Sequence, residues 1–428
     1  MIMMEMLTTW RFRVVFVVVA LFTTMSANAQ SVNLVEERLD NVRDGFFELG
    51  PFYATPVIRF ATGYDSNALS TPDPQADINA MFAPGIRLGL PMGSSAFFDL
   101  YQEVDFVYYR DQVDLRQVFN ITRVGGGWGG RRLLLQIHDE FRDETKRPSS
   151  EFDFPVETRT NQFVASVTMA LGWRQKLTAR YQQYREEILE GSVDDPTIPF
   201  RLNNTRNLVS LDLRRNVSSK TEAVAEGFFE DLQFDDFTRD STSYGARFGF
   251  DFSPEVVGTL ASTTEATGIA GRLLVGFRKL VPVDVRRVDY TGLIGTGDVS
   301  VTTGSGHRLR GVFERDIVPS ILAENWYFVE NRVGAFFRWQ VHERFSIEPG
   351  AVVGQNDYPL PRVLEGDDGE VLEKEIVDEH TSFLLTLEYN IRSSWFVGVT
   401  TRYLDRRSNV FAFDKDRLLV SFNLVLRP

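Results

Sequence analysis

Apolar and polar residues alternate with a period of two through most of this 428-residue chain, and a helical period is nearly absent beyond the N-terminal segment. The segment 242–253 is typical: Tyr244, Phe248 and Phe250 share one face, whereas Arg247 and Asp251 share the other. Such segments are commonly eleven to fifteen residues long. Globular strands have about 5–6 residues, and a tilted strand needs about 9–11 to cross a bilayer. The lengths therefore favour strands that span a membrane.

The alternation predicts an all-β fold, a single-domain transmembrane antiparallel β-barrel of about eighteen strands. An even number of strands puts both termini on the periplasmic side of a bacterial outer membrane. The expected strands cover 52–64, 79–90, 96–109, 113–126, 132–142, 160–173, 176–188, 203–216, 220–234, 242–253, 268–280, 290–301, 306–316, 325–340, 343–357, 378–391, 395–406 and 415–427.

The connections between these strands alternate in length. Those after even-numbered strands are mostly short, including a predicted turn at 127–131, with 254–267 as the exception, whereas 143–159 and 358–377 are long and polar. Short periplasmic turns and long outer loops are typical of outer-membrane barrels. Tryptophan, which prefers the membrane interface, fits this orientation. Four tryptophans fall at the predicted periplasmic end and Trp326 at the other; the four are Trp128, Trp173, Trp339 and Trp395.

The N-terminus has the pattern of a cleaved signal peptide over residues 1–29. Arg11 and Arg13 precede an apolar stretch at 14–22, and Ala27 and Ala29 form a small-residue cleavage site. Residues 30–50 follow as a short periplasmic N-terminal arm, in which 35–45 form either a short helix or, as we expect, a flexible segment. The barrel covers 51–428. These features predict export through the inner membrane and residence in the cell outer membrane.

The amino-acid composition excludes several kinds of site and partner. The formal net charge is -13 and cysteine is absent, so disulfides and cysteine-based metal sites are excluded. The acidic balance argues against nucleic acid as a partner. Lysine occurs only six times among 46 basic residues. The arginine excess reflects either a GC-rich genome or a surface that handles carboxylates, sulfates or sugars.

Signatures of catalysis are weak, and we expect neither an enzyme nor a cofactor or metal site. The four histidines, His138, His307, His342 and His380, show no metal-ligand spacing. His380 and Ser382 share a face, as in some outer-membrane lipid hydrolases, but that face is predicted to point into the lumen rather than toward lipid. The acidic run 365–375 is interpreted as a solvated hairpin tip rather than a cation site.

The predicted lumen is the informative surface, because charges facing lipid would cost several kcal/mol each. Two interpretations stay open: paired charges that only solvate the pore, or a track for an acidic or hydroxyl-rich solute. Four arginines, 308, 310, 332 and 338, are expected to give one wall a modest preference for anions. The lumen-lining candidates are Arg87, Asp99, Glu103, Asp105, Arg180, Arg247, Asp251, Arg308, Arg310, Glu314, Glu330, Arg332, Arg338, Arg402 and Arg417.

Short motifs resemble a family of β-barrel porins associated with exopolysaccharide gene clusters. The motifs are Gly50-Pro51-Phe52, Pro56, the stretch Gly63-Tyr64-Asp65-Ser66-Asn67, and Asp251-Phe252-Ser253-Pro254. The strand number is also similar to that of alginate exporters. The resemblance implies a conduit for exopolysaccharide export that works with periplasmic export proteins. The alternative is a general or solute-selective diffusion porin. Either would contact outer-membrane lipid, lipopolysaccharide and the barrel-insertion machinery.

Overall fold

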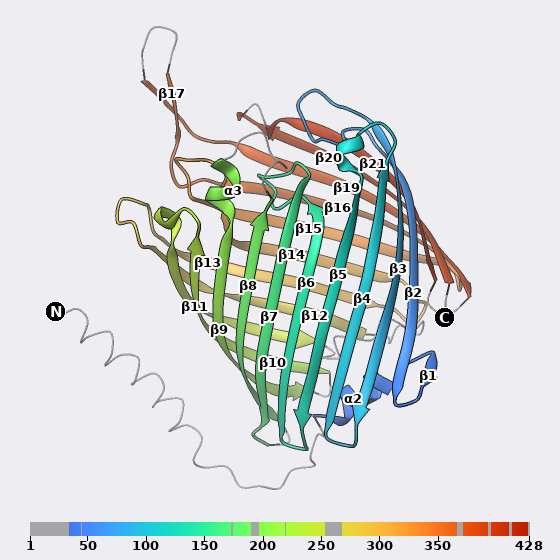
Figure 1. Ribbon diagram of the computed structural model, residues 1–428. Helices are drawn as coiled ribbons and strands as arrows, with labels where there is room; N and C mark the ends of the chain where they lie inside the picture. The colour runs from blue at the N-terminus through green and yellow to red at the C-terminus, as the bar shows by residue number, and fades with distance from the viewer. Residues whose placement is uncertain are drawn as a thin grey trace, which may run out of the picture.

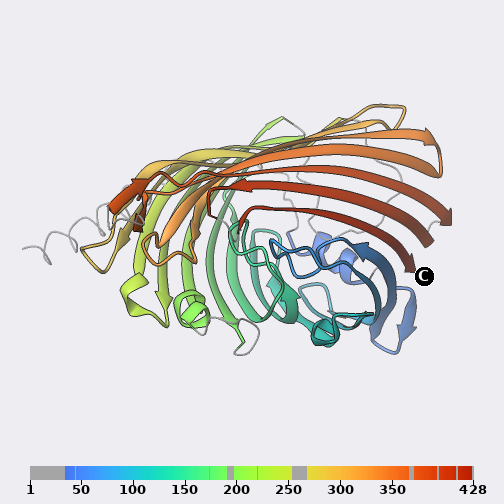
Figure 2. The ribbon, with the colours of Figure 1, turned by 90° about the horizontal axis from the view of Figure 1, so that it is seen from above.

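The computed structural model is a closed antiparallel β-barrel (Figure 1). It describes residues 34–43, 45–172, 174–189, 197–218, 220–252, 268–365, 371–392, 395–410 and 413–426. Among these residues, eighteen long strands form the wall, and each pairs with its neighbours in chain order. The first wall strand, β2, pairs with the last, β21, from Ile58 opposite Leu426 to Asp65 opposite Leu419. Figure 2 shows these two strands side by side where the barrel closes.

The wall strands are β2 (Phe52–Asp65), β3 (Asp77–Met92), β4 (Ala96–Tyr109), β5 (Gln117–Gly129), β6 (Leu133–Lys146), β7 (Val156–Ala170), β8 (Gln175–Ile188), β9 (Asn204–Ser218), β10 (Thr221–Phe234), β11 (Ser241–Phe252), β12 (Gly268–Pro282), β13 (Tyr290–Thr302), β14 (Arg308–Pro319), β15 (Tyr327–His342), β16 (Phe345–Asp357), β19 (Asp378–Arg392), β20 (Trp395–Ser408) and β21 (Lys415–Leu426). A short strand β1 (Phe47–Leu49) pairs with the start of β2. The fold predicted from the alternation is confirmed, and every strand boundary lies within four residues of the predicted one. Two local predictions were wrong: Val113–Leu115 is a 3-10 helix, η1, and Gly127–Gly129 continue β5 instead of forming a turn.

The two faces of the wall differ in polarity. On the outer face of β11 and β12, Phe248 is 59% exposed and Phe277 is 62% exposed. On the inner face of the same strands, Arg247 and Arg278 form ion pairs with Glu226 and Glu230 of β10. Exposed apolar side chains recur on the outer face around the barrel. A band of that extent requires an apolar environment.

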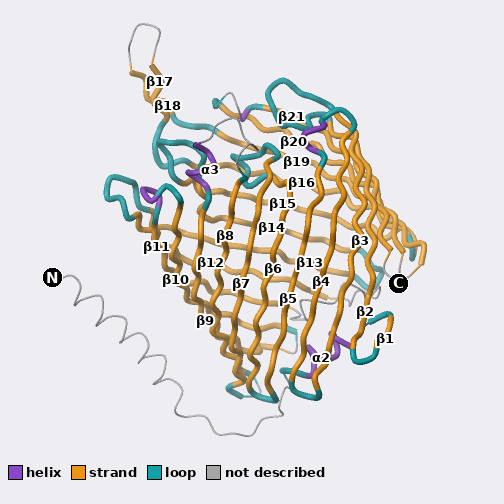
Figure 3. Tube along the Cα trace, viewed as in Figure 1, coloured by secondary structure: helices purple, strands orange, loops and turns teal. Residues whose placement is uncertain are grey.

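The two ends of the barrel differ in the size of their connections. Figure 3 shows short turns at the lower end and larger loops at the upper end. The upper loops include helix α3 (Thr197–Leu202), 3-10 helix η2 (Phe237–Arg239) and a hairpin of β17 (Arg362–Glu365) and β18 (Val371–Lys374). The tip of the acidic run, 366–370, and the connection 253–267 lie outside the described residues.

Three tryptophans follow the predicted orientation. Trp128, Trp339 and Trp395 lie at the lower ends of their strands with 44–55% of each side chain exposed. Trp173 lies outside the described residues. Trp326 differs from an interfacial residue because it is 3% exposed and its indole N–H donates to the carbonyl of Val288. It fills a gap where β14 parts from β13 above Gly295 and Arg315.

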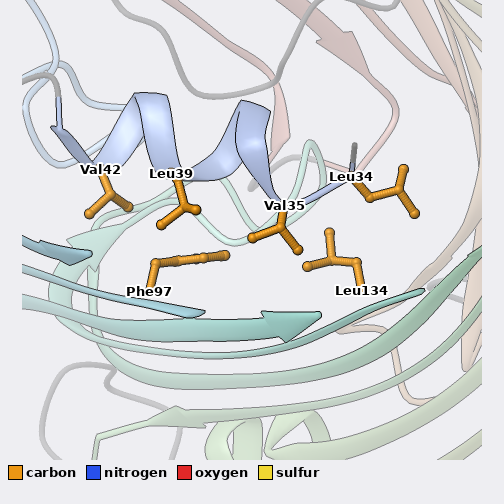
Figure 4. Close-up of a cluster of buried hydrophobic side chains, with 6 residues drawn as sticks. All are labelled: Leu34, Val35, Leu39, Val42, Phe97 and Leu134. Atoms are coloured by element: carbon orange, nitrogen blue, oxygen red, sulfur yellow. The ribbon is translucent and has the colours of Figure 1, made fainter. Parts of the chain in front are cut away.

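Helix α2 (Glu36–Arg43) lies inside the lower end of the barrel (Figures 1 and 4). Its apolar residues Val35, Leu39 and Val42 pack against Phe97 on the inner face of β4, with Leu134 of β6 beside them. The flexible segment expected at 35–45 is therefore a helix, because the spacing of these three residues forms one apolar stripe. None of the helices in the described part of the chain is long and apolar enough to span a membrane.

Candidate functional site in the barrel lumen

The connection between β6 and β7, residues 147–155, folds into the lumen; we call it the inner loop. Its partners belong to the distant wall. The Ser150 hydroxyl is 3.0 Å from the side-chain oxygen of Asn356 on β16, and Lys415 of β21 donates to the carbonyl of Asp153. At its base, Arg147 donates to the carbonyl of Ala68 in the first upper loop. Residues 147–155 were expected to form part of a long outer loop, and the structure instead places them across the channel.

Glu151 is the main polar anchor of the inner loop. Its side chain is 1% exposed, and its carboxylate accepts hydrogen bonds from the Ser320 hydroxyl at 2.7 Å and the backbone N–H of Ile321 at 2.5 Å. The Tyr358 hydroxyl donates to it at 3.1 Å. Burial raises the pKa of Glu151 to about 7 despite these donors. The anchor therefore titrates near neutral pH.

Apolar contacts hold the same loop from its other side. Phe152 is 1% exposed and packs edge-on against Phe154, with ring centroids 4.2 Å apart. Helix α3 supplies Ile198 and Leu202 to this cluster, and Ile321 packs against it. The inner loop thus has a small core of its own, which fixes its path through the lumen.

A cavity of about 750 Å³ lies between the inner loop and the wall formed by β13–β16 and β19–β21. The loop contributes residues 147–150 and Asp153 to its lining. Because cross-strand partners share a face, the register shows which residues of the wall lie side by side on the face toward the cavity. One row across it consists of Phe336, Gly350, Leu384, Arg402 and Leu419.

The fifteen residues predicted to face the lumen all lie in register on the face of the wall opposite the exposed apolar side chains. The structure does not gather them into one site. Six of them line the cavity: Arg310, Glu314, Glu330, Arg332, Arg402 and Arg417. Glu103 and Asp105 bind Arg59 elsewhere on the wall, Asp251 binds Arg214, and Arg87 donates to the carbonyl of Asn41 in α2. Asp99, Arg180, Arg247, Arg308 and Arg338 occupy further inward positions outside the cavity lining.

The four arginines expected to form a positive wall are each matched by a carboxylate. Arg308 binds Glu348 at 3.1 Å, Arg310 binds Asp298 through two hydrogen bonds of 2.6 and 2.7 Å, and Arg338 binds Glu388 at 2.9 Å. Arg332 pairs with Glu314. The expected excess of positive charge on this wall was therefore wrong, because neighbouring inward positions carry the opposite charge.

Other lumen groups were not singled out from the sequence. Glu222, Glu226 and Glu230 form a buried acidic row on β10, each within 4.0 Å of a cation on an adjacent strand. Apolar residues on both faces of β10 hid their spacing of four residues. The inner loop carries no periodic signal, although its Pro148 and serines mark it as irregular.

The possible hydrolytic pair lies in the cavity wall. His380 and Ser382 both line the cavity. The Ser382 hydroxyl is 3.4 Å from Nη2 of Arg402, and Nδ1 of His380 has no hydrogen-bond partner among the described residues. A hydroxyl nucleophile needs a base within hydrogen-bond reach. The contact that the structure gives Ser382 is instead with a guanidinium.

Several residues of the motifs that resemble the porin family make specific contacts or turns in the structure. Asp65 accepts a hydrogen bond from Nε of Arg417 at 2.8 Å where β2 meets β21. Asn67 is fully buried; its side-chain amide donates to the carbonyl of Thr71 and accepts from the backbone N–H of Thr71. Gly50 has a φ of 65°, which favours glycine, and turns the chain from β1 into β2. Ser253 and Pro254 lie outside the described residues.

Comparison with protein-family models and with curated protein sequences gives no match. Solved structures do share the architecture. OccK2 (OpdF) of Pseudomonas aeruginosa is 10% identical with a TM-score of 0.51, over 90% of this chain and 99% of that one. OprD of the same species is 9% identical with a TM-score of 0.47, over 95% and 97%. A bacterial polysaccharide outer membrane secretin is 10% identical with a TM-score of 0.35, over 87% and 98%. At 10% identity the likeness to OccK2 is one of fold.

Proposed function

We propose that this chain is a diffusion channel of the bacterial outer membrane for small solutes, and that the inner loop sets the size of its passage. The observation that carries the proposal is the cavity between the inner loop and the wall, about 750 Å³ in volume, whose lining includes many charged groups. The inner loop narrows the lumen at this level, because it reaches from β6 and β7 to β16 and β21.

The barrel supports the proposal in two ways. Closure gives every wall strand a hydrogen-bonded neighbour on both sides, as an apolar membrane demands, and the exposed apolar band supplies the matching outer surface. Eighteen strands also enclose more space than their inward side chains fill. The signal peptide and the periplasmic placement of both termini, which the sequence predicts, fit a location in the outer membrane.

Reconstitution of the purified full chain into planar bilayers and sugar-loaded liposomes tests the proposal. We expect stepwise ionic conductance, and entry of monosaccharides but not of tetrasaccharides. Shortening the inner loop by replacing residues 149–154 with two glycines should raise both the conductance and the size limit. A folded barrel that conducts no ions with either loop would contradict the proposal.

The export conduit implied by the family resemblance is the second candidate. A polymer would have to displace the inner loop, because Ser150 and Asp153 attach it to the far wall and Glu151 attaches it to the connection between β14 and β15. The absence of cysteine allows a clean test: Ser150→Cys and Asn356→Cys are joined by a short thiol crosslinker in cells. An export conduit would lose polysaccharide secretion on crosslinking, whereas a small-solute channel would keep most of its conductance.

A further inference from the structure

We infer that the wall has a lateral gate between β13 and β14, through which the alkyl chain of an amphiphile with an uncharged, hydroxyl-rich head passes between the lumen and the surrounding membrane. The inference goes beyond the proposed diffusion channel, whose solutes move along the barrel axis. It is carried by an interruption of the strand pairing that side chains bridge.

The strands β13 and β14 pair along only the lower part of their common edge. All of β13 pairs with β12, and all of β14 pairs with β15. Only eight residue pairs join β13 to β14, from Thr302 opposite Arg308 to Gly295 opposite Arg315. Residues 290–294 and 316–319, which the structure describes in full, have no partner in the other strand of this pair. Both strands are complete on their other side, so the opening lies at this edge.

The two sides of the opening overlap. By the period of two, Tyr327 and Val329 of β15 share the outer face with Val333, which is 52% exposed. They are nevertheless only 4% and 6% exposed, because they form one buried cluster with Leu280 from the inner face of β12. Tyr290, the cross-strand partner of Leu280, meets the ring of Tyr327 edge-on at 6.1 Å. The outer face of β15 therefore lies against the inner face of β12 and β13.

Side chains bridge the two edges near the last ladder pair. Nε of Arg315 on β14 donates to the carbonyl of Leu293 on β13 at 3.1 Å. Nη1 of Arg278 on β12 donates to the carboxylate of Asp316 on β14 at 3.0 Å. These contacts stand where a continued ladder would have placed backbone hydrogen bonds.

Two neighbouring aromatic residues hold the upper part of the overlap. The indole N–H of Trp326 donates to the carbonyl of Val288 at 3.0 Å, and the hydroxyl of Tyr327 donates to the carbonyl of Asp289 at 3.1 Å. We call Trp326 and Tyr327 the latch. A change of rotamer releases such contacts while every strand keeps its neighbour on the other side. The overlap can therefore open without unfolding the barrel.

The outer side of the opening borders the apolar band. Gly295, where the pairing ends, lies in one row with Val275 of β12 and Phe248 of β11. Val275 is 52% exposed and Phe248 is 59% exposed on the outer face. Leu293, the next outward residue toward the upper end of β13, is 54% exposed. A molecule that leaves the lumen here meets apolar, lipid-facing side chains, which suit an alkyl chain.

The inner side of the overlap has buried hydroxyls without partners. Ser243 of β11 is the cross-strand partner of Leu280, and Ser241 follows toward the upper end. Both residues are 1% exposed, and their hydroxyls have no hydrogen-bond partner among the described residues. A void of about 10 Å³ lies between Leu280 and the latch, so the packing is incomplete there. The inner side thus offers hydrogen bonds that the closed gate leaves unused.

The charges at the overlap are already paired, which favours an uncharged head. Arg278 binds Glu230 at 2.5 Å and Asp316 at 3.0 Å. A charged head would have to compete with these ion pairs, whereas a sugar-like head needs only hydrogen bonds to groups such as Ser243. With the apolar outer border, the overlap therefore fits an alkyl chain that carries a neutral, hydroxyl-rich head.

Photolabelling of the full chain in phospholipid vesicles tests the inference with two probes built on dodecyl maltoside, used below the concentration that dissolves the vesicles. One probe carries a diazirine at the end of the alkyl chain, and the other carries it on the sugar. We expect the chain probe to label Leu280 and Tyr290 as well as the outer band, and the sugar probe to label Ser243 and Arg278. Maltose with the same diazirine but no alkyl chain is the control probe and should label none of the four.

Variants of the latch test the gate itself. Trp326→Leu combined with Tyr327→Phe removes both latch hydrogen bonds and should raise labelling of Leu280 by the chain probe about fivefold or more. Trp339→Leu, at the exposed lower end of β15, is the matched control and should label as the wild type does. Labelling confined to the outer band in both the wild type and the latch variant would overturn the inference, as would equal labelling by the maltose control.

The absence of cysteine allows the gate to be locked. In Tyr290→Cys with Tyr327→Cys, a short bifunctional thiol reagent joins the two edges. The crosslink should abolish labelling of Leu280 and leave labelling of Phe248 unchanged. Labelling of Leu280 that survives the crosslink would contradict the gate. If the cysteine pair does not fold, the two probes on the wild type and the latch variant decide the question.

Ionic conductance of the same barrels in planar bilayers separates the gate from the proposed function. Crosslinking should leave conductance along the axis unchanged. A conducting barrel that is labelled only on its outer face contradicts the gate alone. A barrel that shows the expected labelling but never conducts supports the gate and contradicts the diffusion channel.

Discussion

Arg406 joins Asp378 on the adjacent strand to the backbone of the inner loop. Its Nε and Nη2 donate to the two carboxylate oxygens of Asp378 at 2.8 Å each, and its Nη1 donates to the carbonyl of Glu151 at 3.1 Å. The side chains of the pair are 1% and 0% exposed. One guanidinium therefore couples the wall to the loop that crosses the lumen.

Replacing Arg406 by methionine should destabilise the barrel by about 3–5 kcal/mol, because Asp378 would remain buried without its partner. The loss is measurable as a lower urea midpoint in gel-shift unfolding. Open-channel current should also fluctuate more, since the loop loses a tether. The double variant Arg406→Met with Asp378→Leu removes the orphaned charge and should recover part of the stability. If the double variant recovers no stability, the loss comes from altered packing and not from the unpaired charge.

The inner loop should be held more firmly at acid than at alkaline pH. Burial raises the pKa of Glu151 to about 7, above the value near 4.5 that it would have if the loop were released into water. Protonation therefore favours the seated loop: the contribution is complete below about pH 4.5 and is lost as the pH rises through 7. Arg406, Tyr358 and Asp378 also face this region.

Single-channel recordings at pH 5, 7 and 8.5 check this expectation, and conductance or current noise should increase with pH. Glu151→Gln keeps the shape and most hydrogen bonds but cannot ionise, so its recordings should not change between pH 5 and 7. A pH response that persists in Glu151→Gln would assign the effect to another group.

Replacing Arg308, Arg310, Arg332 and Arg338 together by glutamine should shift the reversal potential toward cations. The reason is the carboxylates that the substitutions leave unpaired, at Asp298, Glu314, Glu348 and Glu388. Screening over about 8 Å at physiological salt limits the effect, so it should grow at low ionic strength. An unchanged reversal potential in a normally folded variant would show that these ion pairs lie away from the ion path.

Gly89→Ala should displace α2 from the lumen. An added Cβ would lie 2.4 Å from the carbonyl oxygen of Val42, which is backbone and cannot yield by rotation. We expect a higher conductance and faster proteolysis at Arg43 than in the wild type. Gly311→Ala is the matched control, because an added Cβ there meets no atom within 4 Å. Equal behaviour of the two variants would contradict the seating of α2 on β3.

Trypsin treatment of intact cells should cut near Lys374 and spare Arg131 and Arg132. All three residues are exposed, but Lys374 ends β18 in the upper hairpin, whereas the arginines lie in a lower turn between β5 and β6. Permeabilised cells provide the control in which both sites are cut. The reverse pattern in intact cells would invert the orientation of the barrel.

The sequence predicts the wall well because each wall strand carries its own signal. A residue such as Arg247 or Arg402 alternates with apolar neighbours, so its direction can be read from adjacent residues alone. The contents of the lumen depend on distant residues. Glu151 meets Ser320 across a separation of 169 positions, and the partner of Arg310 is fixed by the register of β13 with β14. No local pattern records such contacts, so the inner loop and the neutral arginine wall emerge only from the structure.

Helix α2 contacts β3 and β4, two of the first three wall strands that follow it in the chain. Most of its site therefore exists once β3 and β4 have paired, long before β21 reaches β2. Local contacts form sooner than distant ones because they close shorter loops. The helix does not have to be threaded into a finished cylinder: the growing sheet curls around it, and the seam closes over an interior that is already occupied.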